Sequence, residues 1–349
     1  MPPARRPPEV ARVLQRVTAA VRRHQLFEPG QTVVVACSGG PDSICLLHAL
    51  WRLRRLLRID LVCFHFDHRL REGSDRDVGY VRRQAAGLGV PFAMRTAESK
   101  PARGQSVEAW ARTVRYRSLE EVMEERGAAV AAVGHTLDDQ AETVLMAALR
   151  GGGTEALAAM RPRSDRIVRP LLEVRREETV AFCRALSLRP RRDPMNDDPS
   201  YLRVALRRNV IPAMERALGR GVREPLARTA ALLRSDADWL EAIAAGAYAD
   251  VASPPDDGEV RLRAADLTEL PDAIASRVVR IAVRTLGAEP DASHVEAVRS
   301  LAAGRPGRRA SLPGGLVSRR ERGYVRVFRA GGPGADAGRV GNAGGRRVR

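Results

Sequence analysis

The chain has 349 residues, 44% of them hydrophobic and 29% charged, which is typical of a globular protein with about two domains. No apolar run approaches the roughly 20 residues that cross a bilayer, and no apolar segment of a secretory signal follows the basic N-terminus. The net charge of +17 favours a nucleic acid as partner, although nearly every cation is arginine. Only 4% of the residues are aromatic, which favours backbone and shape contacts to a folded RNA over base stacking.

The four cysteines lie in apolar stretches and lack the CxxC spacing of a metal or redox site. Buried free thiols in a reducing compartment explain this pattern better than disulfides or zinc do. Together with the lack of a predicted membrane span, the pattern predicts a cytoplasmic protein. The cysteines are Cys37, Cys45, Cys63 and Cys183.

Strand-like and helix-like segments alternate through the first half of the chain. Short apolar runs predict strands, and apolar residues at helical spacing predict helices. This rhythm is typical of a parallel sheet with helices on both faces, in which ligands bind beyond the carboxyl ends of the strands. The predicted strands are 32–37, 59–66, 91–97 and 128–135, and the predicted helices are 42–57, 106–127 and 138–153.

The character of the chain changes after about residue 191. A polar, basic segment punctuated by prolines precedes two long helical patterns, at 208–218 and 224–249. A linker is predicted at 252–259, and helices and short late strands follow it. We therefore expect a first domain at 1–218, a second, accessory domain at 219–329 and a disordered Gly/Arg-rich tail at 330–349.

A glycine-containing loop joins the first predicted strand to its helix. Gly39 and Gly40 let the backbone approach an anion, the helix start offers free N–H groups, and Ser38 and Ser43 add hydroxyl donors. A Walker A loop would carry a lysine after the glycines, whereas this loop has Asp42, which could share a Mg²⁺ ion with a phosphate. The loop predicts phosphate binding, and a tight turn without a ligand is the alternative.

The second predicted strand ends in the polar segment 65–77. Within it, His65, Asp67 and His68 have a spacing that suggests a metal site, but two histidines and one aspartate are a weak ligand set. A polar loop after a strand is the simpler interpretation.

Three acids crowd the start of the helix that follows the fourth predicted strand. Asp138, Asp139 and Glu142 lie where the helix dipole favours carboxylates, and Glu142 shares a helix face with Asp138. Capping explains one acid, but not three acids beside His135. The cluster therefore predicts chemistry at this end of the sheet, with a capped helix as the alternative.

Sequence motifs of this chain resemble two nested protein families. SGGPDS after a buried strand resembles the PP-loop of the N-type ATP pyrophosphatases, which cleave ATP between the α and β phosphates and hold the pyrophosphate in this loop. Further motifs resemble the tRNA(Ile)-lysidine synthetases in order and spacing, over about residues 10 to 215 and more weakly as far as about 328. These motifs are HFDHRLR, SVEAWARTVRYRSLEE, GHTLDDQAET, RPLL, DPMN and LRVALRRNVIP, followed by LPGG and YVRVF.

The resemblance implies a fold and a reaction. The fold is an adenine-nucleotide α-hydrolase-like (PP-loop ATPase) α/β domain with a second, mostly helical basic domain that ends in short strands and binds tRNA.

In the reaction, ATP adenylates the C2 carbonyl oxygen of the wobble cytidine of tRNA(Ile) with a CAU anticodon, which releases pyrophosphate. The ε-amine of free L-lysine then attacks C2 and expels AMP, and the resulting lysidine changes codon reading from AUG to AUA and identity from Met to Ile. The implied partners are this tRNA and lysine, without a membrane, and the chain is compatible with a homodimer.

The resemblance also implies roles for individual residues. Asp42 and Asp139 are the expected Mg²⁺ ligands, Asp138 and Glu142 are expected to bind the lysine ammonium or accept its proton, and His135 to contact the α-phosphate or the base. The expected phosphate-binding residues are Ser38, Gly39, Gly40, Pro41, Asp42 and Ser43. The residues expected to face the cytidine, the lysine or the RNA are His65, Asp67, His68, Arg71, Arg115, Arg169, Arg203 and Arg207.

Two departures from the family pattern and two alternative functions remain. Val204 stands where members usually have Asn, and Thr136 stands where a second His is common, which concerns the tRNA side more than the ATP side.

A PP-loop cytidine thiolase also adenylates C2 but carries paired cysteines, which this chain lacks. A non-catalytic nucleotide-binding module with an RNA-binding extension would need the loop but not the three acids. For each isolated arginine, a solvated surface charge is the alternative.

Overall fold

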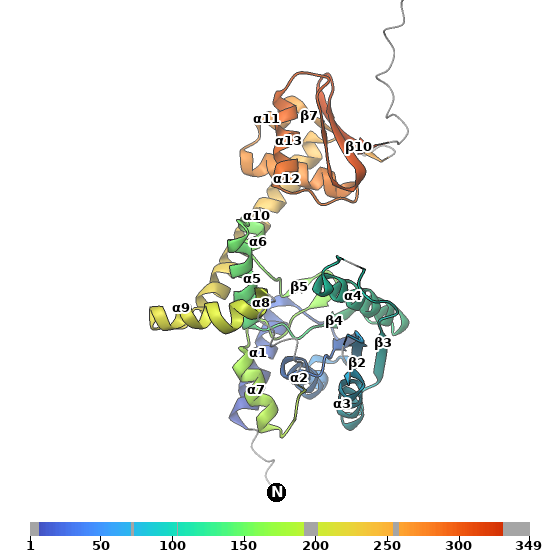
Figure 1. Cartoon of the computed structure of the whole chain (residues 1–349), viewed down its shortest axis with the longest axis vertical. Helices are drawn as coiled ribbons and strands as arrows, with labels where there is room; N and C mark the ends of the chain where they lie inside the picture. Colours follow the sequence, from blue (N-terminus) through green and yellow to red (C-terminus); the bar gives the residue numbers. More distant parts are fainter. Residues whose placement is uncertain (1–6, 71–72, 103, 192–201, 254–257, 331–349) are drawn as a thin grey trace, which may run out of the picture. The chain divides into compact units, whose positions relative to one another are not determined.

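The computed structural model describes residues 7–70, 73–102, 104–191, 202–253 and 258–330. Its contacts divide the chain into two compact units, 1–234 and 235–349, both drawn in Figure 1. This division lies inside helix α10 (Arg223–Val251), whereas the sequence predicts a boundary before that helix, at 218. Residues 254–257 of the predicted linker and 331–349 of the predicted tail lie outside the described residues. Among the described helices, none is long and apolar enough to cross a membrane.

The first unit is built on a six-stranded sheet with the strand order β3-β2-β1-β4-β6-β5. Neighbouring strands run parallel except for the edge pair β5 and β6, which confirms the predicted α/β fold with a parallel sheet. The strands are β1 (Thr32–Ala36), β2 (Asp60–Asp67), β3 (Phe92–Thr96), β4 (Val130–Ala132), β5 (Arg163–Ser164) and β6 (Ile167–Val168).

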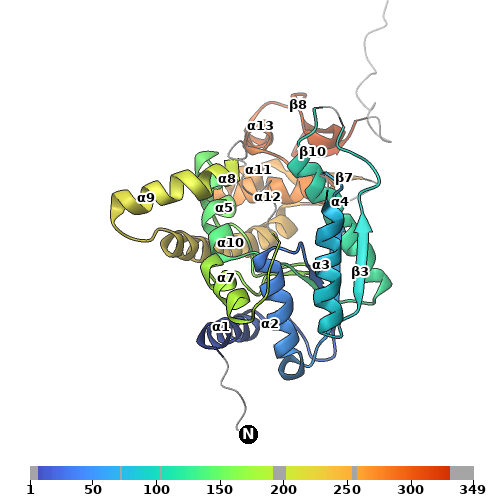
Figure 2. The same cartoon turned by 60° about the horizontal axis from the view of Figure 1, so that its bottom comes forward.

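Helices cover both faces of this sheet because successive strand residues point to opposite sides. Val33 and Val35 of β1 pack into a core with residues of α1, α2, α3 and α7, whereas Val34 packs into a second core with residues of α4. Helices α2 and α3 lie side by side in both views (Figures 1 and 2). The helices are α1 (Pro8–His24), α2 (Pro41–Leu57), α3 (Ser74–Gly87), α4 (Val107–Glu125), α5 (Leu137–Leu149), α6 (Thr154–Leu157) and α7 (Arg176–Ala185).

The order of the strands creates a topological switch point between β1 and β4, and we call the region beyond the carboxyl ends of these strands the crevice. The chain proceeds from β1 outward through β2 and β3, and then returns to place β4 on the other side of β1. Such a switch point is where open α/β sheets bind ligands, beyond the carboxyl ends of the strands. Gly134, just after β4, packs closely here, because a Cβ atom on it would lie 3.2 Å from backbone atoms of Asp42 and Ser43.

The described residues of the first unit after 201 are largely helical, in line with the helices predicted at 208–218 and 224–249. Among them is a π-helical segment, a feature found often at functional sites. The elements are α8 (Leu202–Ala205), the π-helix η2 (Leu206–Val210) and α9 (Ile211–Leu218), which precede α10.

The second unit contains a four-stranded antiparallel sheet with the order β7-β10-β9-β8. One face of this sheet packs on residues of α12 and α13 in a single hydrophobic core. The helices followed by short strands confirm the predicted character of the second domain. The elements are β7 (Glu259–Arg263), α11 (Ala264–Glu269), α12 (Asp272–Thr285), α13 (Ala292–Ala303), β8 (Arg309–Ser311), the 3₁₀ turn η3 (Pro313–Gly315), β9 (Leu316–Arg320) and β10 (Tyr324–Arg329).

The close packing of Gly134 leads to a stability prediction. Gly134→Ala should lower the free energy of unfolding by about 1–3 kcal/mol, because backbone atoms of α2 must shift to admit the Cβ. The control is Gly87→Ala at the exposed end of α3, where a Cβ meets no atom within 4 Å and should stabilise by up to about 1 kcal/mol. Urea unfolding measures both variants. Equal effects of the two substitutions would contradict the tight contact between the β4 loop and α2.

Candidate active site

The loop 38–43 is held in shape by its own serines. The Ser43 hydroxyl accepts a hydrogen bond from the Gly39 amide at 3.2 Å and donates to the Gly40 carbonyl at 3.0 Å, while the two serine hydroxyls lie 3.2 Å apart. Gly39 has a φ of +92°, which favours glycine, and Pro41 begins α2. The loop therefore presents backbone N–H groups at the start of α2, an arrangement suited to a phosphate.

The loop after β4 holds Asp139 by capping α5. The backbone N–H and the hydroxyl of Thr136 both donate to the same carboxylate oxygen of Asp139, each at 2.8 Å. Thr136 is fully buried and Asp139 is 7% exposed. The residue that departs from the family pattern thus orients one of the predicted acids.

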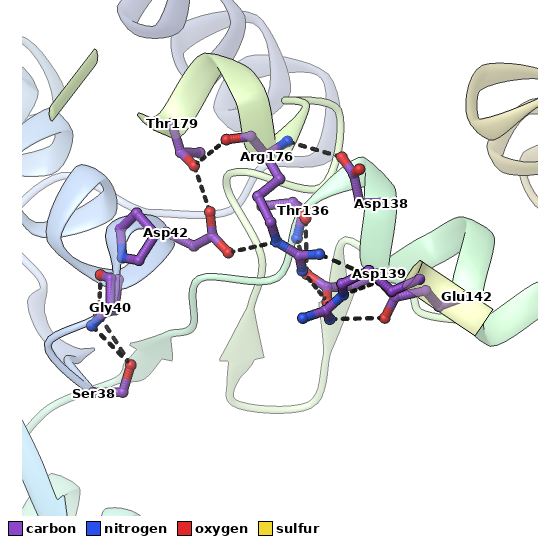
Figure 3. Close-up of polar contacts among 12 residues, drawn as sticks. Ser38, Gly40, Asp42, Thr136, Asp138, Asp139, Glu142, Arg176 and Thr179 are labelled. Atoms are coloured by element: carbon purple, nitrogen blue, oxygen red, sulfur yellow. Dashed lines mark hydrogen bonds and ion pairs between the residues drawn. The ribbon is translucent and has the colours of Figure 1, made fainter. Parts of the chain in front are cut away.

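Arg176, the first residue of α7, joins the two loops (Figure 3). Its guanidinium donates to Asp42 at 3.1 Å, to Asp139 at 2.7 Å and to Glu142 at 3.3 Å. Its backbone N–H donates to Asp138 at 2.8 Å. All four predicted acids therefore converge on one arginine from a third helix.

Three further arginines complete this arginine–carboxylate cluster. Arg207 of η2 donates to the two oxygens of Glu142 at 2.7 and 2.9 Å, and Arg203 lies 3.7 Å from the same carboxylate. Arg223 lies 3.0 Å from Asp138. Two arginines predicted to face the substrate or RNA are therefore bonded to a buried acid. The cluster comprises Asp42, Asp138, Asp139, Glu142, Arg176, Arg203, Arg207 and Arg223, four acids and four arginines.

The hydrogen bonds of Arg176 involve both predicted Mg²⁺ ligands, Asp42 and Asp139. Asp42 and Asp139 share the guanidinium of Arg176, so the two carboxylates as arranged hold an arginine and do not fit a common Mg²⁺ ion. No group of three His, Cys, Asp or Glu residues in the described part of the chain could hold a metal. Mg²⁺ binding by these two residues stays a prediction of the sequence.

Burial and the arginines act in opposite directions on the acids. Burial alone would raise the pKa of Asp139, but Arg176, His135 and the Thr136 hydrogen bonds hold it well below its usual range. Burial prevails at Asp42, whose pKa is raised although Arg176 and the hydroxyl of Thr179 favour the ionised form. The cluster therefore contains one firmly ionised acid and one that takes up a proton more readily.

His135 lies in a positively charged part of the crevice. Its pKa is lowered to about 4, mainly by burial, with Asp139 opposing this shift and the neighbouring Arg169, Arg115 and Arg112 adding to it. The Nδ1 atom of His135 is buried and has no hydrogen-bond partner within the described part of the chain. His135 is therefore neutral at physiological pH and beside cations that would attract a phosphate.

Arg169 is anchored within this positively charged part. It is 7% exposed and donates to the Arg161 carbonyl at 2.7 Å. Burial lowers the pKa of Arg115 as well as that of Arg169, but a guanidinium keeps its charge in proteins. Within the described residues, no ion pair joins Arg112, Arg115 or Arg169 to an acid, and all three add positive charge near the neutral His135.

His65, Asp67 and His68, at the end of β2, do not gather into a metal site. The Nδ1 atom of His65 lies 2.7 Å from the Cys37 carbonyl, so this buried side chain supports the end of β1. Asp67 accepts hydrogen bonds from the Arg69 amide and the Ser74 hydroxyl, and the His68 ring packs edge-on against Phe66. Arg71 lies outside the described residues.

Several residues of the site were not predicted from the sequence, among them Arg223 and Arg112. Two more, Arg176 and Thr179, lie in α7, and Thr179 donates a short hydrogen bond to Asp42. The only signal for them was an amphipathic pattern after RPLL, which does not reveal which side chains point toward the crevice.

The cysteines are buried and free, as predicted. Cys37 and Cys63 are neighbours, and so are Cys45 and Cys183, in different parts of the core. Burial raises the pKa of the Cys183 thiol to about 12. Such thiols are inert, and their arrangement gives no support to sulfur transfer.

Comparison with known proteins identifies the relatives of this chain. Residues 10–214 match the PP-loop domain, and residues 262–326 match the TilS substrate binding domain. The chain is 42% identical to the tRNA(Ile)-lysidine synthase of Salinispora arenicola, over 89% of this chain and 95% of the relative. It is 38% identical to that of Thermobifida fusca, over 92% and 98%. The U34-tRNA thiolase NcsA from Methanococcus maripaludis shares the fold, with a TM-score of 0.55 at 16% identity over 65% of this chain and 79% of that one.

The environment of His135 predicts its titration. Because burial and three arginines disfavour the imidazolium, its ring resonances should not shift between pH 8 and pH 5 in an NMR titration. The unfolded chain protonates this residue near pH 6.5, so its contribution to stability should be lost as the pH falls from about 6.5 toward 4. His135→Gln cannot take up this proton, so this variant should lose less stability than the wild type as the pH falls from about 6.5 toward 4. A ring that titrates above pH 6 would show that the site is open to water.

The position of Arg176 predicts a large effect on stability. Arg176→Ala leaves Asp139 and Glu142 buried with fewer cations, and should lower the free energy of unfolding by about 3 kcal/mol. Arg184→Ala, at an exposed position of the same helix, should change it by less than about 0.5 kcal/mol. Both are measured by urea unfolding at neutral pH. Similar values for the two variants would mean that Arg176 is an ordinary surface charge.

Proposed function

The chain belongs to the tRNA(Ile)-lysidine synthase family, ATP-using PP-loop ligases that form the carbon–nitrogen bond of lysidine, and we propose that its crevice between β1 and β4 carries out both steps of that reaction. In the first step, the C2 carbonyl oxygen of the wobble cytidine attacks the α-phosphorus of ATP and pyrophosphate leaves. In the second step, the ε-amine of lysine attacks C2, AMP leaves with the C2 oxygen, and the amine loses a proton. The observation that carries the proposal is the convergence of the loop 38–43 with four acids at the switch point of the sheet.

The loop 38–43 supports the first step. Its backbone N–H groups and serine hydroxyls would hold the β and γ phosphates, because fixed donors at a helix start stabilise the charge that develops on the leaving pyrophosphate. The cations around His135 would hold the α-phosphate side. Since His135 is neutral, it can accept or donate a hydrogen bond there without adding charge.

The acids of α5 support the second step. Lysine arrives with an ammonium group, and an acid must bind it and take up its proton before the amine can attack. Asp138 and Glu142 are our proposed acids. Glu142 is 1% exposed and already accepts two bonds from Arg207, so lysine would reach it only if an arginine moved. Asp138, with a side chain 14% exposed, is the more accessible of the two.

Two parts of the sequence-based account stay predictions. Mg²⁺ is expected to accompany ATP, but Asp42 and Asp139 do not fit a shared ion while both are bonded to Arg176. A homodimer is also a prediction of the sequence alone. Binding of tRNA(Ile) is supported by the match of residues 262–326 to a substrate binding domain.

An omission assay tests the proposed function. The protein is incubated with ATP labelled in its α-phosphate, Mg²⁺, lysine and CAU-anticodon tRNA(Ile), and each component is left out in turn. We expect AMP, and a tRNA nucleoside with the mass of lysidine, only when lysine and this tRNA are both present. AMP that ignores lysine but requires a sulfur donor would assign the chain to the thiolases. A failure to form AMP in every mixture would contradict the proposal.

Asp42 provides a residue-level test of the same proposal. Asp42→Ala removes the carboxylate that joins the loop helix to Arg176, and should lower the rate of AMP formation by at least about 100-fold. The control is Asp60→Ala, an exposed acid at the opposite end of the sheet, which should keep the wild-type rate. Unfolding midpoints confirm that both variants are folded. Near wild-type turnover by Asp42→Ala would exclude this acid from the reaction.

A further inference from the structure

The antiparallel sheet of the second unit has one buried and one outward face. Val260 and Leu262 of β7 and Val325 and Val327 of β10 point into the hydrophobic core. Because strand residues alternate, the residues between them point away from the core. That outward face is rich in arginine.

Four arginines form a continuous row across this face. Arg261 of β7 is directly opposite Arg326 of β10, Arg326 is opposite Arg319 of β9, and Arg319 is opposite Arg309 of β8. Directly opposed residues on neighbouring strands share a face, and like charges in such pairs are destabilising. A row of this kind through all four strands needs a compensating partner.

Carboxylates of the chain neutralise the positive charge at one end of the row only. Glu259 forms ion pairs with Arg326 and Arg261, and Glu321 lies 3.7 Å from Arg326. Within the described residues, no acid pairs with Arg319 or Arg309. The β9 and β8 side of the row therefore keeps its positive charge.

A pocket lies beside the row. Its volume is about 450 Å³, and three members of the row, Arg261, Arg319 and Arg326, line it together with Arg320 and Arg322. Pro306, Gly307 and Glu321 complete the lining, in which Glu321 is the one acid. A concave surface with this excess of guanidinium groups fits a planar or tetrahedral oxyanion that accepts several hydrogen bonds.

We infer that the arginine row (Arg261, Arg326, Arg319 and Arg309) and its pocket bind the phosphodiester backbone of an RNA through the uncompensated Arg319 and Arg309, because Arg326 is 7% exposed and paired with Glu259. Neighbouring strands are about 4.8 Å apart, so the row spans about 14 Å, enough for more than one phosphate of a strand. Two aromatic rings of β10, Tyr324 and Phe328, share this face, but Phe328 is 8% exposed and packs against Arg326, so guanidinium groups outnumber exposed rings, which favours the backbone over the bases. The inference rests on the proposed function for the identity of the RNA, a tRNA.

The test compares two double variants of equal charge. Arg309→Gln/Arg319→Gln removes the two uncompensated members of the row. The matched control, Arg284→Gln/Arg299→Gln, removes two arginines of the same unit that pair with acids on its helices or loops. Binding of fluorescent CAU-anticodon tRNA(Ile) is measured by anisotropy over a range of salt concentrations, and lysidine formation is measured in parallel.

The row variant should bind the tRNA at least about tenfold more weakly near 0.1 M salt, and the slope of log K against log salt should fall by about two. Its KM for tRNA should rise while kcat changes by less than about twofold. The control pair should keep the wild-type slope. Arg319→Gln alone should lower the slope by about one, and it replaces the double variant if the latter does not fold.

The outcomes separate this inference from the proposed function. If the wild type makes lysidine and the row variant binds tRNA like the control pair, the inference is wrong and the proposed function stands; an acidic protein then becomes the better partner for this face. If the wild type makes no lysidine but the row variant loses tRNA affinity and salt slope, the row binds RNA and the proposed function fails.

Discussion

The guanidinium of Arg176 is the point on which the candidate active site depends, because it joins three helices that are far apart in the sequence. Asp42 comes from α2, Asp139 and Glu142 from α5, and Arg176 itself from α7. Carboxylates this close would repel one another and take up protons if no cation lay between them. A buried ionic cluster usually contributes less to net stability than apolar packing of the same volume. Its value here is that it fixes the positions of the acids relative to the loop 38–43.

The topology of the sheet makes this cluster possible. β1 and β4 are neighbours although their final residues, Ala36 and Ala132, are 96 positions apart in the sequence, and their carboxyl ends lie at the same edge of the sheet. Gly134 lets the β4 loop approach the backbone of α2, and the buried Thr136 turns Asp139 toward Arg176. Positive charge is then distributed on two sides: four arginines neutralise the acids, and a separate group lies near His135, where we propose that phosphates bind. On this proposal, the same fold serves an anionic and a cationic substrate.

The sequence predicts the parts of this arrangement that depend on local patterns. Strand–glycine–helix signals identify the loop 38–43, and the parallel-sheet rule brings it together with Asp138 and Asp139. The sequence does not reveal Arg176, since an arginine in an amphipathic helix looks the same whether it faces solvent or a carboxylate. Nor does it distinguish the partners of Arg207, because a phosphate and a buried carboxylate attract a guanidinium alike. Helix α3 is missed because its polar residues resemble a loop, although Asp77 is buried and paired with Arg191.

A double-mutant cycle between Arg176 and Asp139 tests the central role of the cluster most directly. Urea unfolding of Arg176→Ala, Asp139→Asn and the double variant gives the coupling energy between the two side chains. The exposed pair Arg263 and Asp266 provides the reference, for which about 0.5 kcal/mol is expected. For Arg176 and Asp139 we expect about 2 kcal/mol or more, because both are largely withdrawn from water. A coupling no larger than that of the exposed pair would mean that Arg176 does not organise the acids, and would contradict this account of the site.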